Sequence, residues 1–214
     1  MSTPPRLDLR EGTCFPYLPS LDQGSEQSCV AHAFAAGLYC VKRAAGAATF
    51  PSSGRLFPRQ ETLFEEAALQ SHDRSRGVSF EGVIASVFRQ HGEDLRQLGW
   101  KLVRVPNDRE FVKRRLLSGA PVVVGYQVDP RIYRFHTSAA ACEQHGYLLP
   151  PFGGQAATTS AHAVLIVGYD DAVGSFLARN SWGQAWGVDG HFLIRYEDLE
   201  NPEFFTDVAS FARA

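Results

Sequence analysis

The chain has 214 residues, of which 44% are hydrophobic and 21% charged, the balance of an ordinary soluble globular protein. That length can bury one good core, or two small lobes that share an interface. The net charge of −2 gives no electrostatic reason to expect nucleic acid or an anionic membrane as partner, and no apolar run is long enough to span a bilayer. We therefore expect a protein that acts neither on nucleic acid nor within a membrane.

The cysteines and the first residues indicate in which cellular compartment the protein works. The first ten residues are polar and contain two prolines, so they resemble neither a secretory signal nor a transit helix. Cys14, Cys29, Cys40 and Cys142 are too few and too scattered for a disulfide framework, and none has zinc-site spacing, so no metal is expected. A reducing compartment is favoured, either cytoplasmic or inside a host. For Cys142, a bridge to Cys14 and a free thiol both stay open.

The N-terminal half predicts helices. The chain is loop-like as far as about Gln27, and then apolar residues recur at helical spacing from Val30 to Val41. Ser28 stands where an N-cap is expected, and Gly46 where the helix should stop. Further helices are predicted over residues 59–71, 80–91 and 108–117.

The C-terminal half predicts strands. β-branched runs at 122–128 and 163–169 indicate two strands, and 175–179 and 191–196 two more. The segment 129–160 is expected to be a long irregular loop, functional or mobile. Helices followed by antiparallel strands predict an α+β protein. We expect one domain over 1–214, with a helical lobe at about 20–105 and a lobe resembling an antiparallel β-barrel at 106–214.

A nucleophile is suggested at the start of the first long helix. Cys29 falls in the first turn, where unpaired backbone N–H groups and the helix dipole favour a thiolate. Gln23, six residues earlier in a turn, could bring a side-chain amide to the same place, and with the N–H of Cys29 it would form an oxyanion hole. On helix position alone, a buried packing cysteine is the more common interpretation.

Two later blocks change that balance. His162 opens a strongly apolar strand, where a histidine is usually a satisfied surface or core residue. Beyond it stands a block of one asparagine, two tryptophans and three glycines that packing alone does not require. These residues are Asn180, Trp182, Gly183, Trp186, Gly187 and Gly190.

Together the three blocks resemble the papain and cathepsin family over nearly the whole chain. Asp22 to Cys29 is similar to the nucleophile motif of that family, Ser160 to Val164 to its histidine motif, and Asn180 to Gly190 to its asparagine motif. His162 follows Cys29 by 133 residues and Asn180 follows it by 151, close to the roughly 130–150 expected for this arrangement. Three blocks in this order favour catalysis over coincidence.

The resemblance implies a papain-like two-lobed fold, with the active-site cleft between the lobes, and a cysteine peptidase. Cys29 would attack a peptide carbonyl, and His162, paired with it as an ion pair, would later protonate the leaving amine. Asn180 would orient His162, and Trp182 would shield their contact and border the substrate. Gln23 would complete the oxyanion hole. Water then hydrolyses the acyl-enzyme, so no cofactor is expected, and the protein would act on polypeptides as a monomer.

The resemblance also suggests substrate-binding residues. Gly77, followed by Val78, matches the second glycine of a family segment that pairs with the substrate backbone. Ala163 and either Val124 or Gly125 would line the pocket for the residue one before the scissile position, which would take a medium apolar side chain. Gly77 as an ordinary turn glycine is an equal alternative.

The chain departs from the family at several positions. Glu26-Gln27 replaces a Cys-Gly pair, which removes a common disulfide and puts a side chain beside the cleft. Val30 and Ala161 replace a tryptophan and an acidic or amide residue. The first and last segments resemble a microbial or viral branch in which a large propeptide is not evident. Any latency would come from the N-terminal arm or the 129–160 loop.

Other interpretations stay open. His32, one turn after Cys29, is a competing base. The activity could be that of a deubiquitinase-like or host-directed thiol hydrolase of narrow specificity, or the chain could be a binding module whose cleft is obstructed by Glu26 and Gln27. The remaining histidines are interpreted as surface or packing residues: His72, His91, His136, His145 and His191.

Overall fold

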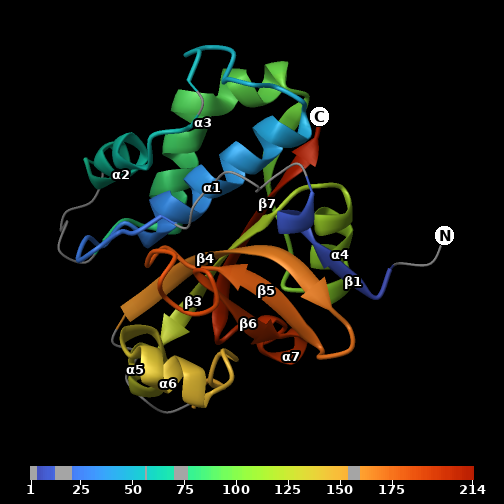
Figure 1. Cartoon of the computed structure of the whole chain (residues 1–214). Helices are drawn as coiled ribbons and strands as arrows, with labels where there is room; N and C mark the ends of the chain where they lie inside the picture. Colours follow the sequence, from blue (N-terminus) through green and yellow to red (C-terminus); the bar gives the residue numbers. More distant parts are fainter. Residues whose placement is uncertain (1–3, 13–20, 56, 70–76, 154–159) are drawn as a thin grey trace.

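The computed structural model describes residues 4–12, 21–55, 57–69, 77–153 and 160–214. In Figure 1 the N-terminal helices lie on one side of a twisted sheet, and further helices lie at its other end. The helices are α1 (Cys29–Ala44), α2 (Gln60–Ala68), α3 (Phe80–Gln97), α4 (Arg109–Leu117), α5 (Pro130–Thr137), α6 (Ala139–Gln144) and α7 (Tyr196–Leu199), with a 3₁₀ turn at Leu9–Glu11. The strands are β1 (Arg6–Asp8), β2 (Trp100–Arg104), β3 (Val122–Val128), β4 (Ser160–Asp170), β5 (Ser175–Arg179), β6 (His191–Arg195) and β7 (Phe205–Arg213).

The four helices predicted from apolar spacing are all present, and the main difference lies in α3. This helix runs to Gln97 rather than to residue 91, because its last turns still bury Asp94 and Leu95. Gly99, two residues beyond this end, has a φ of +73°, which suits a glycine after a helix C-terminus. Among the described residues, no helix is both long and apolar enough to cross a membrane.

The sheet is antiparallel and seven-stranded, with the order β2-β7-β3-β4-β5-β6 and with β1 paired to β4. It is an open sheet rather than a closed barrel, which corrects the barrel-like form expected for the C-terminal lobe. Strands β1, β2 and β7 were not predicted, and β1 lies in the N-terminal segment that was expected to be loop-like. Strand β2 precedes the lobe boundary expected at 105/106, yet it pairs with β7 as part of the sheet.

The long loop expected over 129–160 is wrong for its first half, where α5 and α6 form. The carboxylate of Asp129 accepts from the backbone N–H groups of Arg131 and Ile132, and Pro130 occupies the first turn of α5. The hydroxyl of Ser138 caps α6 in the same way. Side-chain caps therefore supply the helix starts that apolar periodicity did not reveal. The strand predicted over 191–196 ends at Arg195.

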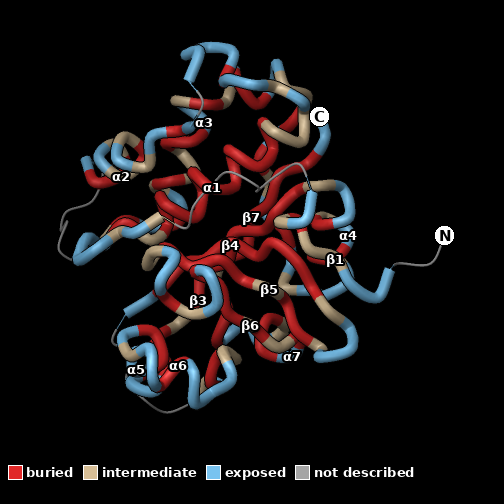
Figure 2. Tube along the Cα trace, in the orientation of Figure 1, coloured by how far each residue is buried: buried red, intermediate tan, exposed pale blue. Residues whose placement is uncertain are grey.

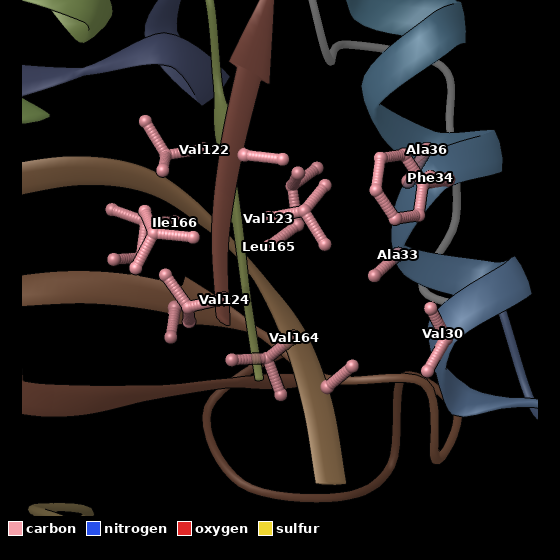
Figure 3. Packing of buried hydrophobic residues seen from close by; sticks show 14 of the residues in the cluster. Val30, Ala33, Phe34, Ala36, Val122, Val123, Val124, Val164, Leu165 and Ile166 are labelled. Carbon is pink, nitrogen blue, oxygen red and sulfur yellow. The ribbon is translucent and has the colours of Figure 1, made fainter. Parts of the chain in front are cut away.

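Helix α1 is the centre of the core. Figure 3 shows Val123 of β3 and Leu165 of β4 pointing toward α1, while Val122 and Ile166 point away from it, as alternation along a strand requires. Helices α2 and α3 also contact α1. Figure 2 accordingly shows α1 and the middle of the sheet as buried. Since α1 is held on several sides, the position of its N-terminal residue, Cys29, is fixed.

Candidate active site

Cys29 is the first residue of α1 and is partly buried. Ser28 occupies the N-cap position, as predicted, although its hydroxyl makes no capping hydrogen bond. Burial raises the pKa of the Cys29 thiol, while backbone hydrogen bonds from Ala163 and Val30 act in the opposite direction. The sulfur therefore lies beside Ala163, the residue that follows His162 in β4.

His162 is buried and bonded to Asn180. Its Nε2 lies 2.8 Å from Oδ1 of Asn180, and the backbone N–H of Ser181 donates to the same oxygen at 2.9 Å. An amide oxygen only accepts hydrogen bonds, so Nε2 must carry the proton of the imidazole. The other ring nitrogen, Nδ1, is then left as the basic nitrogen. This is the tautomer that a general base beside a thiol needs.

Burial governs the charge of the two groups. Burial lowers the pKa of His162 to about 4, and this effect exceeds that of the hydrogen bond to Asn180, which raises the pKa. The same effect raises the pKa of Cys29. Both shifts favour a neutral thiol and a neutral imidazole, so burial works against the ion pair expected from the family resemblance.

Aromatic rings lie beside the His162–Asn180 contact. The ring of Trp182 lies 5.4 Å from that of His162, and Trp186 lies 5.9 Å from Trp182, each measured between ring centroids. Trp186 is itself buried and packs against Phe192 of β6. The two tryptophans of the asparagine block thus pack against each other beside His162, and the shielding role of Trp182 stays a prediction.

Gln23 is held beside the asparagine block rather than left in a free turn. Its backbone N–H donates to the carbonyl of Ser181 at 2.8 Å, and its side-chain oxygen accepts from the Ser181 hydroxyl at 2.6 Å. The side-chain nitrogen donates to the carbonyl of Glu26 at 2.6 Å. One amide hydrogen is thus already engaged, and the role of Gln23 in an oxyanion hole stays a prediction.

A groove of about 660 Å³ brings together most of the predicted site. Cys29 and His162 line it, together with the predicted substrate-binding residues Gly77, Val78 and Ala163. The remaining described lining residues are Gln27, Val30, Ser79, Phe80, Gly125, Gln127, Ser160, Ala161, Thr206 and Asp207.

Gly77 has a specific reason to be a glycine. Its φ is +82°, and a Cβ atom there would lie 3.0 Å from the backbone oxygen of Gln27. Both the backbone conformation and the close approach exclude a larger residue. Gly77 thus allows the wall of the groove to approach the backbone of Gln27, in the segment before Cys29. Gln27 borders the groove, which nevertheless reaches Cys29.

No sequence motif pointed to a second buried histidine at this site. The Nε2 of His136 lies 2.6 Å from the hydroxyl oxygen of Tyr126, and both residues are buried. The ring of His136 lies 5.0 Å from that of His162 and 5.1 Å from that of Trp182. Trp186 donates to its backbone carbonyl at 2.8 Å. His136 belongs to α5, in the segment expected to be irregular, and stands in no motif.

Two alternatives concerned other residues: His32 as the base, and Cys142 with Cys14 as a disulfide. The Nδ1 of His32 donates to the carbonyl of Ser28 at 3.0 Å, so this ring is tied to the backbone of its own helix. Cys142 is a buried free thiol, and burial raises its pKa to about 11, while Cys14 lies outside the described residues. Across the described part of the chain, no group of three or more acidic, histidine or cysteine residues could hold a metal ion.

Sequence comparison assigns the family. Residues 89–208, more than half of the chain, match the model of the papain family of cysteine proteases. The chain belongs to this family. The matched range contains His162 and Asn180, whereas Cys29 lies before it. The resemblance to the papain family is therefore confirmed, while the block at Cys29 lies outside the matched range and its role stays a prediction.

The curated relatives match only in part. An uncharacterized peptidase C1-like protein of Acanthamoeba polyphaga mimivirus is 30% identical over 99 residues, which are 46% of this chain and 30% of the viral protein. The cysteine proteinase COT44 of Brassica napus is 33% identical over 92 residues, 42% of this chain and 25% of the plant protein. The chain thus matches less than a third of the length of either relative.

Solved structures agree on the fold. Xylellain, a cysteine protease from Xylella fastidiosa, superimposes with a TM-score of 0.75 at 21% identity, covering 100% of this chain and 87% of that one. The Carica candamarcensis cysteine protease CMS1MS2, solved in complex with E-64, gives a TM-score of 0.63 at 18% identity, covering 96% and 97%. At these identities the likeness establishes a papain-like fold.

Proposed function

We propose that the chain is a cysteine peptidase that hydrolyses peptide bonds through an acyl-enzyme on Cys29. The observation that carries this proposal is the bond from Nε2 of His162 to Asn180, on a histidine that lines the same groove as Cys29. That bond leaves Nδ1 basic in a site where a thiol is available. Membership of the papain family supports the same reaction.

The reaction begins when a peptide enters the groove. The thiol proton of Cys29 passes to Nδ1 of His162 as the sulfur bonds to the carbonyl carbon, and the carbonyl electron pair moves to oxygen. The backbone N–H of Cys29 at the start of α1, with Gln23, would stabilise that oxygen. When the C–N bond breaks, His162 returns its proton to the leaving amine. Water, deprotonated by His162, then cleaves the thioester and releases the acid.

Burial also determines when the charged imidazolium of His162 forms. The free groove favours the neutral pair of Cys29 and His162, so the charged imidazolium forms only as the sulfur attacks. Asn180 assists at that moment, because its hydrogen bond raises the pKa of His162.

We expect a peptidyl epoxide, which alkylates activated thiols, to add once to the wild-type protein and not to Cys29→Ala. Asn180→Ala should slow the addition by about 100-fold, since the imidazole then loses its fixed orientation. Cys142→Ala is the matched control, because this buried thiol lies outside the groove, and it should label like wild type. Intact-mass spectrometry from pH 4 to 9 measures the adduct and its rate.

Two other outcomes of these experiments would contradict or narrow the proposed function. Equal labelling of Cys29→Ala, or no adduct at all, would contradict the proposal and favour a binding module. An adduct on Cys29 with cleavage of ubiquitin-linked probes, but not of short peptides, would narrow the activity to a deubiquitinase-like hydrolase.

A further inference from the structure

Tyr126 is the cross-strand neighbour of the proposed base. In the register between β3 and β4, Tyr126 is directly opposite His162. Residues in that relation project from the same face of a sheet, so their side chains meet. The two ring centroids lie 5.8 Å apart, and the rings are nearly perpendicular, at 89°. Tyr126 is buried, so its ring forms a fixed wall beside the imidazole.

The hydroxyl of Tyr126 is bonded to a residue of α5. Its oxygen lies 2.6 Å from Nε2 of His136, and among the described residues this is the hydrogen bond that satisfies it. Burial raises the pKa of Tyr126 and lowers that of His136, so the hydroxyl keeps its proton and the imidazole stays neutral. If Nε2 were the donor, the hydroxyl proton would have no acceptor. Tyr126 is therefore the donor in this bond.

His136 is held at its ring and at its main chain. The hydroxyl of Tyr126 holds the ring, and the indole N–H of Trp186 donates to the backbone carbonyl at 2.8 Å. The ring packs against His162, at 5.0 Å between centroids, and meets the ring of Trp182 edge to face at 5.1 Å. His136 thus connects β3 to the two rings of the site that lie on β4 and after β5.

His162 needs this support, because its hydrogen bond to Asn180 holds the imidazole at a single atom, Nε2. A ring held at one atom can still tilt unless its neighbours prevent it. A general base must lie within hydrogen-bond reach of the proton that it takes, and a misplacement of about 1 Å can cost about 100-fold in rate. Tyr126 and His136 border the imidazole from two different elements, which restricts that tilt.

We infer that Tyr126 and His136 are positioning residues for the reaction: the hydrogen bond between them holds the ring of His136 against His162 and keeps Nδ1 of His162 within reach of the Cys29 thiol. The inference rests on the proposed peptidase function and adds two residues that take no part in bond making. Neither residue belongs to any of the three sequence blocks.

Iodoacetamide, which reacts with the thiolate of a cysteine, tests this arrangement. At pH 6, well below the usual thiol pKa of about 8.5, a thiolate on Cys29 forms when His162 takes the proton. Tyr126→Phe removes one oxygen and keeps the ring, and it should slow the labelling of Cys29 about tenfold at pH 6. At pH 9.5 hydroxide removes the proton without His162, so both proteins should react at about the same rate. Peptide mapping by mass spectrometry locates the label and gives its rate.

Matched variants separate positioning from general damage. His136→Leu should show the same slowing at pH 6 and the same recovery at pH 9.5. Tyr133→Phe, which removes an exposed hydroxyl from α5, should label like wild type at both pH values. In a His162→Ala protein, which has no imidazole to position, adding Tyr126→Phe should leave the remaining slow labelling unchanged. Each rate is measured below the thermal unfolding transition of the variant.

The outcomes separate this inference from the proposed function. Equal rates for wild type and Tyr126→Phe at pH 6 overturn the inference. A slowing that persists at pH 9.5, or in the His162→Ala background, also overturns it, because the damage then lies at Cys29 itself. The peptidyl epoxide tests the peptidase function independently. If it gives no adduct while the iodoacetamide rates differ as expected, the peptidase function is contradicted, and the positioning of His162 toward the thiol stands.

Discussion

His162 is surrounded by groups that bury and orient it. Asn180 fixes its tautomer, Trp182 covers it, and the ring of His136 lies against it. Burial lowers the pKa of His136, and the nearby His162 lowers it further. The buried bond between Tyr126 and His136 therefore supports a packing partner of the proposed base, and it is the least expected feature of the site.

A double-mutant cycle tests this bond. Tyr126→Phe leaves the Nε2 of His136 without its partner, and His136→Phe does the same to the Tyr126 hydroxyl, so each change should lower the free energy of unfolding by about 1–3 kcal/mol. The double variant should be more stable than the sum predicts, by about 1 kcal/mol. Urea denaturation of the four proteins measures the coupling. Additive losses would mean that the hydrogen bond contributes no net coupling.

Helix α1 determines where Cys29 lies, and its packing against the sheet is close. At Gly37 a Cβ atom would lie 2.7 Å from the ring of Phe211 in β7 and 3.5 Å from Leu165 in β4. A glycine in a helix interior is normally a weakness. Here it lets the helix approach the two strands that border the groove.

A pair of glycine substitutions separates packing from helix propensity. Gly37→Ala should destabilise the protein by about 1–3 kcal/mol, because overlap with a buried ring exceeds the gain in propensity. Gly92→Ala in α3 is the control, since nothing lies within 4 Å of the added atom, and it should stabilise by about 0.5–1 kcal/mol. Thermal unfolding compares both with wild type. A stabilising Gly37→Ala would show that α1 can shift away from the sheet.

Buried histidines make the stability of the whole molecule depend on pH. Burial lowers the pKa of His162 and of His191 to about 4, and that of His136 well below its ordinary value. In the unfolded chain each would titrate near about 6.5. Between these values the unfolded state binds more protons, so the free energy of unfolding falls as the pH falls.

We expect the free energy of unfolding to drop between pH 6.5 and 5, by about 1.4 kcal/mol per pH unit for each histidine that titrates only in the unfolded chain. Carboxylates, which titrate nearer pH 4, contribute less in this window. Urea denaturation at several pH values gives the slope. His191→Gln, at a histidine outside the groove, should reduce the slope by the share of one residue. A flat profile would contradict neutral buried histidines.

Local sequence features were enough to predict much of the fold and to select the residues proposed for the site. Apolar spacing located α1 to α4, and β-branched runs located β3 and β4, because both signals come from residues close together in the chain. Strand β7 was not predicted from the sequence, because it lies between β2 and β3 and is buried on both faces over most of its length. Such a strand lacks the alternation of apolar and polar residues that marks a half-exposed strand.

The sequence by itself determined the family, the order of Cys29, His162 and Asn180, and the helix that begins at Cys29, because motifs and caps are written in consecutive residues. The tertiary structure decided that the sheet is open, that His136 of α5 lies against His162, and that Asp207 of β7 faces Gly125. Each of these depends on pairing between segments far apart in the chain. No local pattern encodes which strand or helix will be the neighbour.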